Sequence, residues 1–261
     1  MLAKLAILPY ICEKNNAMLS QSSSQMPLAV NHISVDCVVL GFDGEKLRVL
    51  LIKRVGEENG QVFHDMKLPG GLIFTDENLD DAARRVLREL TGIKSINLLQ
   101  FKAYGSKDRT KNAKDVHWLE RAIQMKVDRI VTIAYIALVR INRGLTNSSG
   151  ENEICWVPLD EVKTLAFDHN IILADAIDVV RRHAEADPSY LFNLLPQKFT
   201  ILQLRTLYER VYGKPQDVRN FQKKVNQLDY VVALDEREQG VAHRAARLYR
   251  FDRKLFKRVR R

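Results

Sequence analysis

The chain has 261 residues, of which 46% are hydrophobic and 28% are charged, a composition typical of a soluble globular protein. No apolar run approaches the roughly 18 to 20 residues of a membrane-spanning helix, so no membrane partner is expected. The net charge is +9. Residues 196–261 hold 17 Lys and Arg against 7 Asp and Glu, so the whole excess lies in the last quarter. This segment is therefore expected to have a polyanionic partner.

Residues 1–30 precede the first strand-like segment and are predicted to be a disordered extension or an over-long start of the chain. The apolar run from Leu5 to Cys12 weakly resembles a signal peptide, but it is short and no small-residue cleavage site follows it. The cysteines, Cys12, Cys37 and Cys155, are odd in number and far apart, which argues against a disulfide framework or a zinc site. We therefore expect a cytoplasmic protein without a cofactor or a metal.

Residues 31–188 have the pattern of one domain that combines strands and helices. Strands are expected at 32–42 and 46–54, and Asp43-Gly44 between them favours a hairpin. A loop with two glycines is expected at 55–65. The later elements are a helix at 78–90 that stops before Gly92, strands at 130–141 and 154–159 around a polar loop at 145–153, and a helix at 170–185. This order predicts a mixed sheet covered by helices.

Residues 189–261 are predicted to form a second domain, with 189–196 as the connector. A helix is expected from Thr200, its N-cap, to Tyr212. A second helix follows Asp217, and strands are expected at 230–234 and 247–251. Two short helices and a β-hairpin are typical of a winged helix. The expected apolar stripe of the second helix is Val218, Phe221, Val225 and Leu228.

The polar face of that second helix combines cations, which bind phosphates, with amides, which read base edges. The hairpin is expected to contact the DNA backbone or the minor groove. A small basic domain that packs on another protein remains an alternative. The predicted DNA-binding residues are Lys198, Arg219, Asn220, Gln222, Lys223, Lys224, Gln227, His243, Arg244 and Arg247.

Residues 67–93, KLPGGLIFTDENLDDAARRVLRELTGI, resemble the signature of the Nudix family. The matching positions are Gly71, Glu77, Arg85, Leu87, Glu89, Gly92 and Ile93. In that family, several carboxylates on one helix face hold divalent metals that activate water against a pyrophosphate.

Val86 and Leu90 occupy two of the three metal-binding glutamate positions of this signature, and only Glu89 remains. One carboxylate is a poor Mg²⁺ site. We therefore expect a scaffold without catalytic residues and not an enzyme. An active Nudix pyrophosphohydrolase with relocated ligands is the alternative from a different class.

The chain from about Asn31 to Phe251 resembles the Nudix-related bacterial transcriptional regulators. Beyond the signature, this resemblance rests on stretches such as RIVTIAYIALV at 129–139 and LFNLLPQKFTILQLRTLYERVYGK at 191–214. The resemblance implies an α+β fold, in which a Nudix α/β/α sandwich with a mixed sheet precedes a winged helix-turn-helix domain. It also implies a repressor, usually a homodimer, that binds double-stranded operator DNA and senses a small-molecule effector.

Residues 111–128, KNAKDVHWLERAIQMKVD, look like an insertion, and a tryptophan among polar groups suits sugar recognition. Among the Nudix-related regulators, the chain most resembles the arabinose-responsive sugar branch, and this resemblance implies a regulator of carbohydrate metabolism that responds to a sugar such as L-arabinose. Sensing of ADP-ribose to control NAD metabolism is the alternative, and a helix that packs Trp118 into the dimer or the core is the other interpretation of the insertion. The predicted ligand-binding residues are Lys67, Glu77, Arg85, Glu89, His117, Trp118, Asp168 and His169.

Overall fold

The computed structural model describes residues 32–58, 60–94, 96–141, 153–240, 242 and 244–259. The predicted extension at 1–30, most of the predicted polar loop at 145–153, and His243 lie outside these residues. None of the helices within the described ranges is long and apolar enough to cross a membrane.

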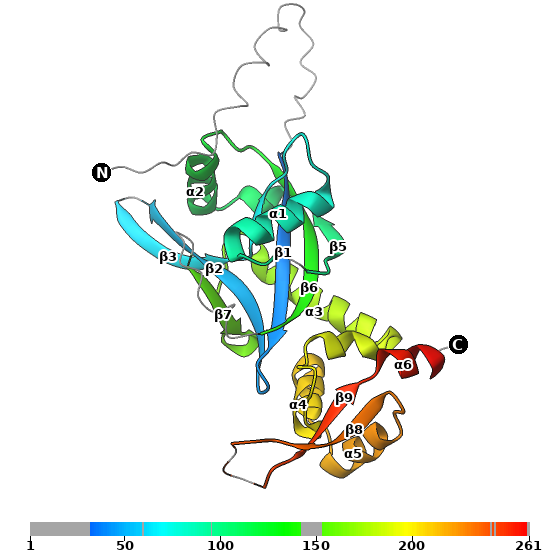
Figure 1. Cartoon of the computed structure of the whole chain (residues 1–261). Helices are drawn as coiled ribbons and strands as arrows, with labels where there is room; N and C mark the ends of the chain where they lie inside the picture. The colour runs from blue at the N-terminus through cyan, green and yellow to red at the C-terminus, as the bar shows by residue number, and fades with distance from the viewer. Residues whose placement is uncertain are drawn as a thin grey trace, which may run out of the picture. The chain divides into compact units, whose positions relative to one another are not determined.

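A seven-stranded mixed sheet forms the centre of the first part of the chain (Figure 1). β1 (His32–Phe42) is central, because it pairs in parallel with β6 (Ile130–Arg140) and antiparallel with β2 (Leu47–Glu58). The mixed sheet is therefore confirmed. The remaining strands are β3 (Gln61–Lys67) and β7 (Ile154–Pro158) beside β2, β4 (Gly70–Leu72) beside β1, and β5 (Leu99–Tyr104) beside β6.

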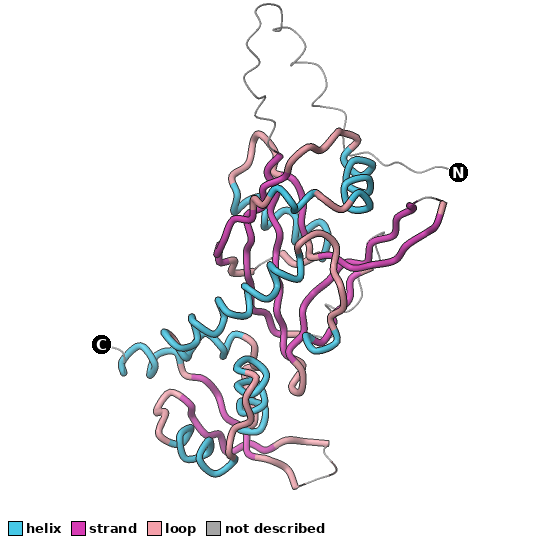
Figure 2. The backbone as a smooth tube through the Cα atoms, turned by 180° about the vertical axis from the view of Figure 1, so that it is seen from behind, coloured by secondary structure: helices cyan, strands magenta, loops and turns pink. Residues whose placement is uncertain are grey.

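The sheet lies between two helical layers, α1 (Leu79–Thr91) on one face and α3 (His169–Ala186) on the other (Figures 1 and 2). Alternate side chains of a strand point to opposite faces. Cys37 and Val39 accordingly belong to the core beneath α1, whereas Val38 and Leu40 belong to the core shared with α3. The predicted α/β/α sandwich is confirmed.

Both ends of α1 are set by its sequence. The Asn78 side chain accepts a hydrogen bond from the backbone N–H of Asp81, as an N-cap should. Gly92 takes a left-handed conformation with φ 72° just past the last turn, which a residue with a side chain rarely adopts. The apparent insertion contains a further helix, α2 (Ala113–Ile123).

The C-terminal part has the order of a winged helix (Figure 1). Thr200 begins α4 (Ile201–Tyr212) through a capping box with Gln203, in which each side chain satisfies a backbone N–H of the other residue. The predicted Thr200 N-cap is confirmed. The later elements are α5 (Val218–Asn226), capped by Asp217, the hairpin of β8 (Val231–Arg237) and β9 (Arg247–Phe251), and the short helix α6 (Arg253–Val259).

Two sequence interpretations are wrong. Residues 55–65 are largely strand, because β2 and β3 stay paired from Ile52–Lys67 to Glu58–Gln61. These strands extend beyond the apolar core and are held partly by charged pairs, which hydrophobic patterning does not detect. Val218 is 60% exposed and not part of the buried stripe of α5. It occupies the first turn, before the helix meets the core at Phe221.

Candidate functional site

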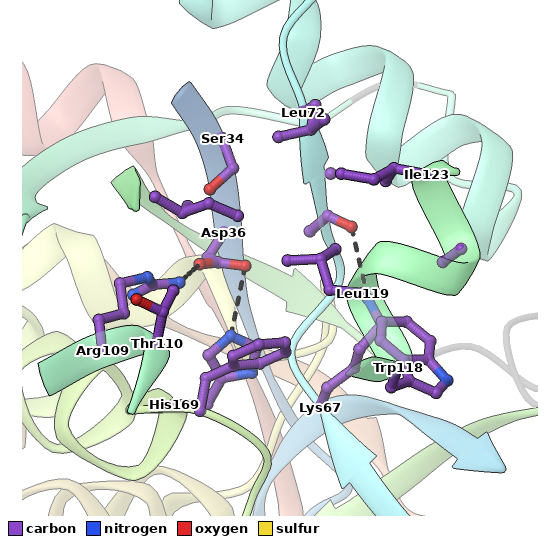
Figure 3. A pocket seen from close by; sticks show the side chains of 15 residues that line it. Ser34, Asp36, Lys67, Leu72, Arg109, Thr110, Trp118, Leu119, Ile123 and His169 are labelled. Carbon is purple, nitrogen blue, oxygen red and sulfur yellow. Dashed lines mark hydrogen bonds and ion pairs between the residues drawn. The ribbon is translucent and has the colours of Figure 1, made fainter. Parts of the chain in front are cut away.

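A cavity of about 160 Å³ lies beside β1 and β4, and α2 forms one of its walls (Figure 3). Polar groups from the two strands and from the turn Lys107–Thr110 face it, and apolar side chains of α2 face them. The lining residues are Ser34, Asp36, Lys67, Gly70, Gly71, Leu72, Arg109, Thr110, Trp118, Leu119, Ala122, Ile123, Ile130, Phe167 and His169.

Asp36 is the centre of a buried polar network on one side of this cavity (Figure 3). Its Oδ2 accepts a hydrogen bond of 2.7 Å from Arg109, and its Oδ1 lies 3.5 Å from Nε2 of His169. Arg109 also donates to Oδ1 of Asp168 at 2.5 Å. Arg109 is therefore neutralised by two carboxylates and is not free to bind an anion.

The backbone orients the His169 ring. The Leu68 N–H donates to Nδ1 of His169 at 3.0 Å, and a ring nitrogen can accept only if it carries no proton. This contact leaves Nε2 facing Asp36. Burial by itself would raise the pKa of Asp36, but His169 and Arg109 beside it hold the pKa of this carboxyl below its usual range.

Only glycine fits at position 70, beside the Asp36 carboxylate. A Cβ at position 70 would lie 2.0 Å from Oδ1 of Asp36 and 2.9 Å from the backbone oxygen of Val35. Both distances are far below van der Waals contact. The glycine therefore permits a close approach of β4 to the polar network.

Lys67 lies across the cavity from Arg109 and has much weaker partners (Figure 3). It is 9% exposed, and its Nζ reaches only the backbone oxygens of Leu68 and Gly70, both at 3.4 Å. Its Nζ lies 5.8 Å from the ring centroid of Trp118. Burial lowers the pKa of Lys67, and Asp36 only partly opposes that effect.

Arg54 holds the aromatic wall of the cavity in place. This side chain is 2% exposed, and its guanidinium carbon lies 5.1 to 5.5 Å from the ring centroids of Phe63, Trp118 and Phe167. It donates to Asp65 through two hydrogen bonds of 2.6 Å. The stacked cation thus joins β2, α2 and the segment before α3.

Asp115 connects this cluster to the backbone at Phe167. Its Oδ1 accepts from Arg54 at 2.5 Å, and its Oδ2 accepts from the Phe167 N–H at 3.0 Å. Phe167 has a φ of 55°, a left-handed conformation that costs free energy for a non-glycine residue and that clusters at functional sites. The polar contacts of Asp115 offset that strain and direct the ring toward the cavity.

The predicted Nudix signature forms a separate cluster on α1. Arg85 donates to both carboxylate oxygens of Glu77, to the backbone oxygen of Leu72 and to Glu89. Its guanidinium carbon lies 3.8 Å from the ring centroid of Phe74. Both remaining acidic positions of the signature therefore bind an arginine, and no group of three metal-ligating side chains occurs among the described residues.

The predicted ligand-binding residues fall into three groups. Lys67, Trp118 and His169 line the cavity, and Asp168 holds Arg109 behind it. His117 lies in another depression on α2, beside Glu120 and Arg121. The structure places Glu77, Arg85 and Glu89 together on α1 and not among the lining residues.

Sequence reasoning missed Asp36, Arg109, Phe167 and Arg54. Asp36 had a usable signal, because it is an acid within the apolar run of β1, and a buried charge needs a partner. The other three are brought together only by tertiary pairing.

A second candidate site is the exposed face of α5. Arg219, Lys223 and Lys224 are exposed there and form no ion pair with any described residue. The amide side chains of Asn220 and Gln227 are also exposed. The Gln222 side chain donates to Asn226 at 2.9 Å. The buried side chains of the helix, Phe221 and Val225, face the core.

The predicted cations outside α5 are differently placed. Lys198 donates to Glu236 at 2.6 and 2.8 Å, and Arg247 pairs with Asp235 at 3.0 Å and with the backbone oxygen of Leu234. Arg244 is exposed. Lys198 and Arg247 are therefore paired with acidic side chains, whereas no ion pair is found for Arg219, Lys223 or Lys224 of α5 among the described residues.

Two family models match the chain, the NUDIX domain over residues 30–177 and the NrtR DNA-binding winged helix domain over residues 191–251. The described cavity belongs to the first match and the α5 face to the second.

A relative from Acinetobacter baylyi, described as an ADPR responsive transcriptional repressor NtrR, is 27% identical over 223 residues, which cover 84% of this chain and 81% of that protein. Two crystal structures of Shewanella oneidensis NrtR are similar. The free protein has 26% identity and a TM-score of 0.61 over 84% of this chain and 94% of the other. The complex with a 27mer DNA has 24% identity and a TM-score of 0.63 over 86% and 95%, and supports the fold.

Proposed function

The chain belongs to the NUDIX domain family and carries an NrtR-type winged helix domain, and from this premise we propose that it is a transcriptional repressor that binds operator DNA and responds to ADP-ribose. The observation that carries the DNA-binding part is the face of α5, where Arg219, Lys223 and Lys224 are exposed and without acidic partners. Phosphate contacts from such residues supply most of the affinity for DNA.

ADP-ribose takes the place of the L-arabinose that the sequence suggested. The Acinetobacter baylyi relative is described as ADPR responsive, and no comparison supports a sugar effector or a role in carbohydrate metabolism. The cavity agrees with this choice, because Lys67 is a buried cation with no carboxylate partner among its described contacts. A neutral sugar offers no charge to such a group.

We further propose that the Nudix-like domain serves as a sensor and not as a hydrolase. Mg²⁺ needs several clustered oxygen ligands. Glu77 and Glu89 are bound by Arg85, and Val86 stands buried where the family signature has another glutamate. The competing hydrolase function predicts release of AMP from ADP-ribose with Mg²⁺, which a nucleotide assay would detect.

A gel-shift titration tests the proposal. Promoter DNA from the neighbourhood of the gene is titrated with the full chain, first without ligand, then with ADP-ribose and, separately, with L-arabinose. A shifted band that ADP-ribose alone removes or strengthens supports the proposal. Absence of any shift at low salt would refute the repressor function, and a response to L-arabinose alone would restore the sugar effector. The homodimer stays a prediction, which sedimentation analysis can test.

A further inference from the structure

We propose that Lys67 binds a phosphoryl group of the effector, so that the cavity accepts sugar phosphates and nucleotide sugars and rejects free sugars. This inference rests on the proposed function only in placing the effector in this cavity. Its first support is the bonding of Lys67 itself. An ammonium group offers three donors, yet Lys67 finds two carbonyl oxygens, each at 3.4 Å, where a normal bond to a charged donor measures about 2.7 to 2.9 Å.

The second support is the arrangement of the other charges. Asp36 is the one carboxylate among the described lining residues, and Arg109 and His169 already occupy both of its oxygens. Arg109 in turn is bound by Asp36 and Asp168. Lys67 is therefore the one lining cation within the described ranges without a carboxylate at ion-pair distance.

Burial of the charged Lys67 side chain costs free energy unless an anion binds to it. Transfer of an unpaired ammonium out of water carries a large desolvation penalty, and the same burial lowers the pKa of Lys67. A phosphate monoanion or dianion would supply both charge and acceptor oxygens. The cavity side chains Ser34 and Thr110 add hydroxyl groups, which can bond the hydroxyls of a sugar.

The size of the cavity limits what it can enclose. At about 160 Å³, it lies below the roughly 300 Å³ at which typical ligand pockets begin. It therefore encloses a part of a nucleotide sugar, and the rest of such a ligand must extend outside it. A sugar phosphate should accordingly be a sufficient minimal ligand.

Calorimetry with the full chain at low ionic strength tests this inference. The titrants are D-ribose, inorganic phosphate, D-ribose 5-phosphate and ADP-ribose. The variants are Lys67→Met, which keeps the volume and removes the charge, and Lys53→Met, which removes an exposed lysine of β2. We expect D-ribose 5-phosphate to bind at least tenfold more tightly than D-ribose. Lys67→Met should lose at least tenfold in affinity for both phosphorylated ligands, and Lys53→Met should match the wild type.

The pH profile provides an independent readout that does not need a variant. Affinity for D-ribose 5-phosphate should fall in the alkaline range, beginning below the ordinary lysine pKa of about 10.4, because deprotonation removes the charge that binds phosphate. Equal affinities for D-ribose and its phosphate, or an unaltered affinity in a folded Lys67→Met, would overturn the inference. Inorganic phosphate binding as tightly as the sugar phosphate would also overturn it, because the sugar would then contribute nothing.

The experiments distinguish a failure of this inference from a failure of the proposed function. If ADP-ribose releases DNA equally well from the wild type and from Lys67→Met, the repressor stands and the role of Lys67 fails. If D-ribose 5-phosphate binding depends on Lys67 but no DNA is bound, the phosphate site stands and the repressor fails.

Discussion

Arg85 and Glu77, eight positions apart in the same signature, are joined by two hydrogen bonds of 2.6 and 2.8 Å. Glu77 lies just before α1 and Arg85 in its middle, and their side chains are 12% and 15% exposed. Arg85 also bonds the backbone of β4 at Leu72. The signature therefore connects helix and sheet through an ion pair.

Replacement of Arg85 by Ala should destabilise the fold. The change removes the paired hydrogen bonds to Glu77 and leaves that carboxylate without its partner, which costs about 2 to 4 kcal/mol for a largely buried pair. Urea denaturation measures the free energy of unfolding. The matched control is Arg84→Ala, because Arg84 is about half exposed and touches Asp81 only at 3.4 Å, so a change below about 0.5 kcal/mol is expected. Equal effects of the two substitutions would contradict the structural role of Arg85.

The sequence predicted the layers and the winged helix because those features follow from local patterns. The alternation of β1, the stripe of α1 and the caps at Asn78 and Thr200 each depend on residues close in the chain. Such patterns are what periodicity and capping detect.

The cavity was harder to predict because it is made by long-range pairing of charged residues. Arg54 meets Asp115 from a strand and a helix far apart in the sequence, and Arg109 meets Asp36 in the same way. Neither arginine belongs to a motif with a fixed spacing. Lys67, Trp118 and His169 were named from the expected position of a Nudix cleft, and their part in ligand binding stays a prediction.

Gly70→Ala should disrupt the polar network at the cavity. The added Cβ would meet Oδ1 of Asp36 at 2.0 Å, so either the strand β4 or the Asp36 carboxylate must move, at a cost of about 2 to 4 kcal/mol. Gly105→Ala is the control, because its Cβ would meet only the Val131 side chain at 3.4 Å, an ordinary contact. Chemical denaturation compares the two. A neutral Gly70→Ala would show that β4 does not approach Asp36 as closely as described.

Acid should weaken the fold partly through Asp36. Its pKa is lowered in the folded protein, relative to about 3.9 in an unfolded chain. The ionised carboxylate therefore adds stability above about pH 4, and this contribution is lost as the pH falls toward the lower folded value. The stability difference between the wild type and Asp36→Asn should be largest above pH 5 and should narrow on acidification. The exposed Asp76→Asn serves as control, and a difference that stays constant with pH would exclude the linkage.

Lys67→Met should raise the melting temperature of the unliganded protein. The pKa of Lys67 is lowered in the fold because burial opposes its charge. The charged lysine thus destabilises the protein at neutral pH, and this penalty starts to decline as the pH rises past the lowered folded pKa and disappears only above the unfolded pKa of about 10.4. Removal of the charge at constant volume removes the penalty, whereas Lys53→Met at an exposed position should change little. Differential scanning calorimetry at pH 7 measures both, and a lower melting temperature for Lys67→Met would mean that the lysine stabilises the fold.

The combined substitution Lys223→Ala and Lys224→Ala should weaken operator binding and its dependence on salt. Each lost phosphate contact lowers the slope of log affinity against log salt concentration by about 0.9, so two contacts correspond to a decrease of about 1.8. Fluorescence anisotropy at several salt concentrations gives this slope. The fold should be unaffected, because both side chains are exposed and the buried residues of α5 are Phe221 and Val225.

A charge-matched control separates a specific contact from general attraction. Lys254→Ala with Lys257→Ala removes the same charge from α6, which lies beyond the matched winged helix at 191–251. If α5 is the DNA-recognition helix, the α5 variant should lose at least tenfold more affinity than the α6 variant. Equal losses of affinity would mean that DNA binding depends only on the net charge of the C-terminal segment. Substitutions in a recognition helix should reduce the affinity more than the same loss of charge elsewhere.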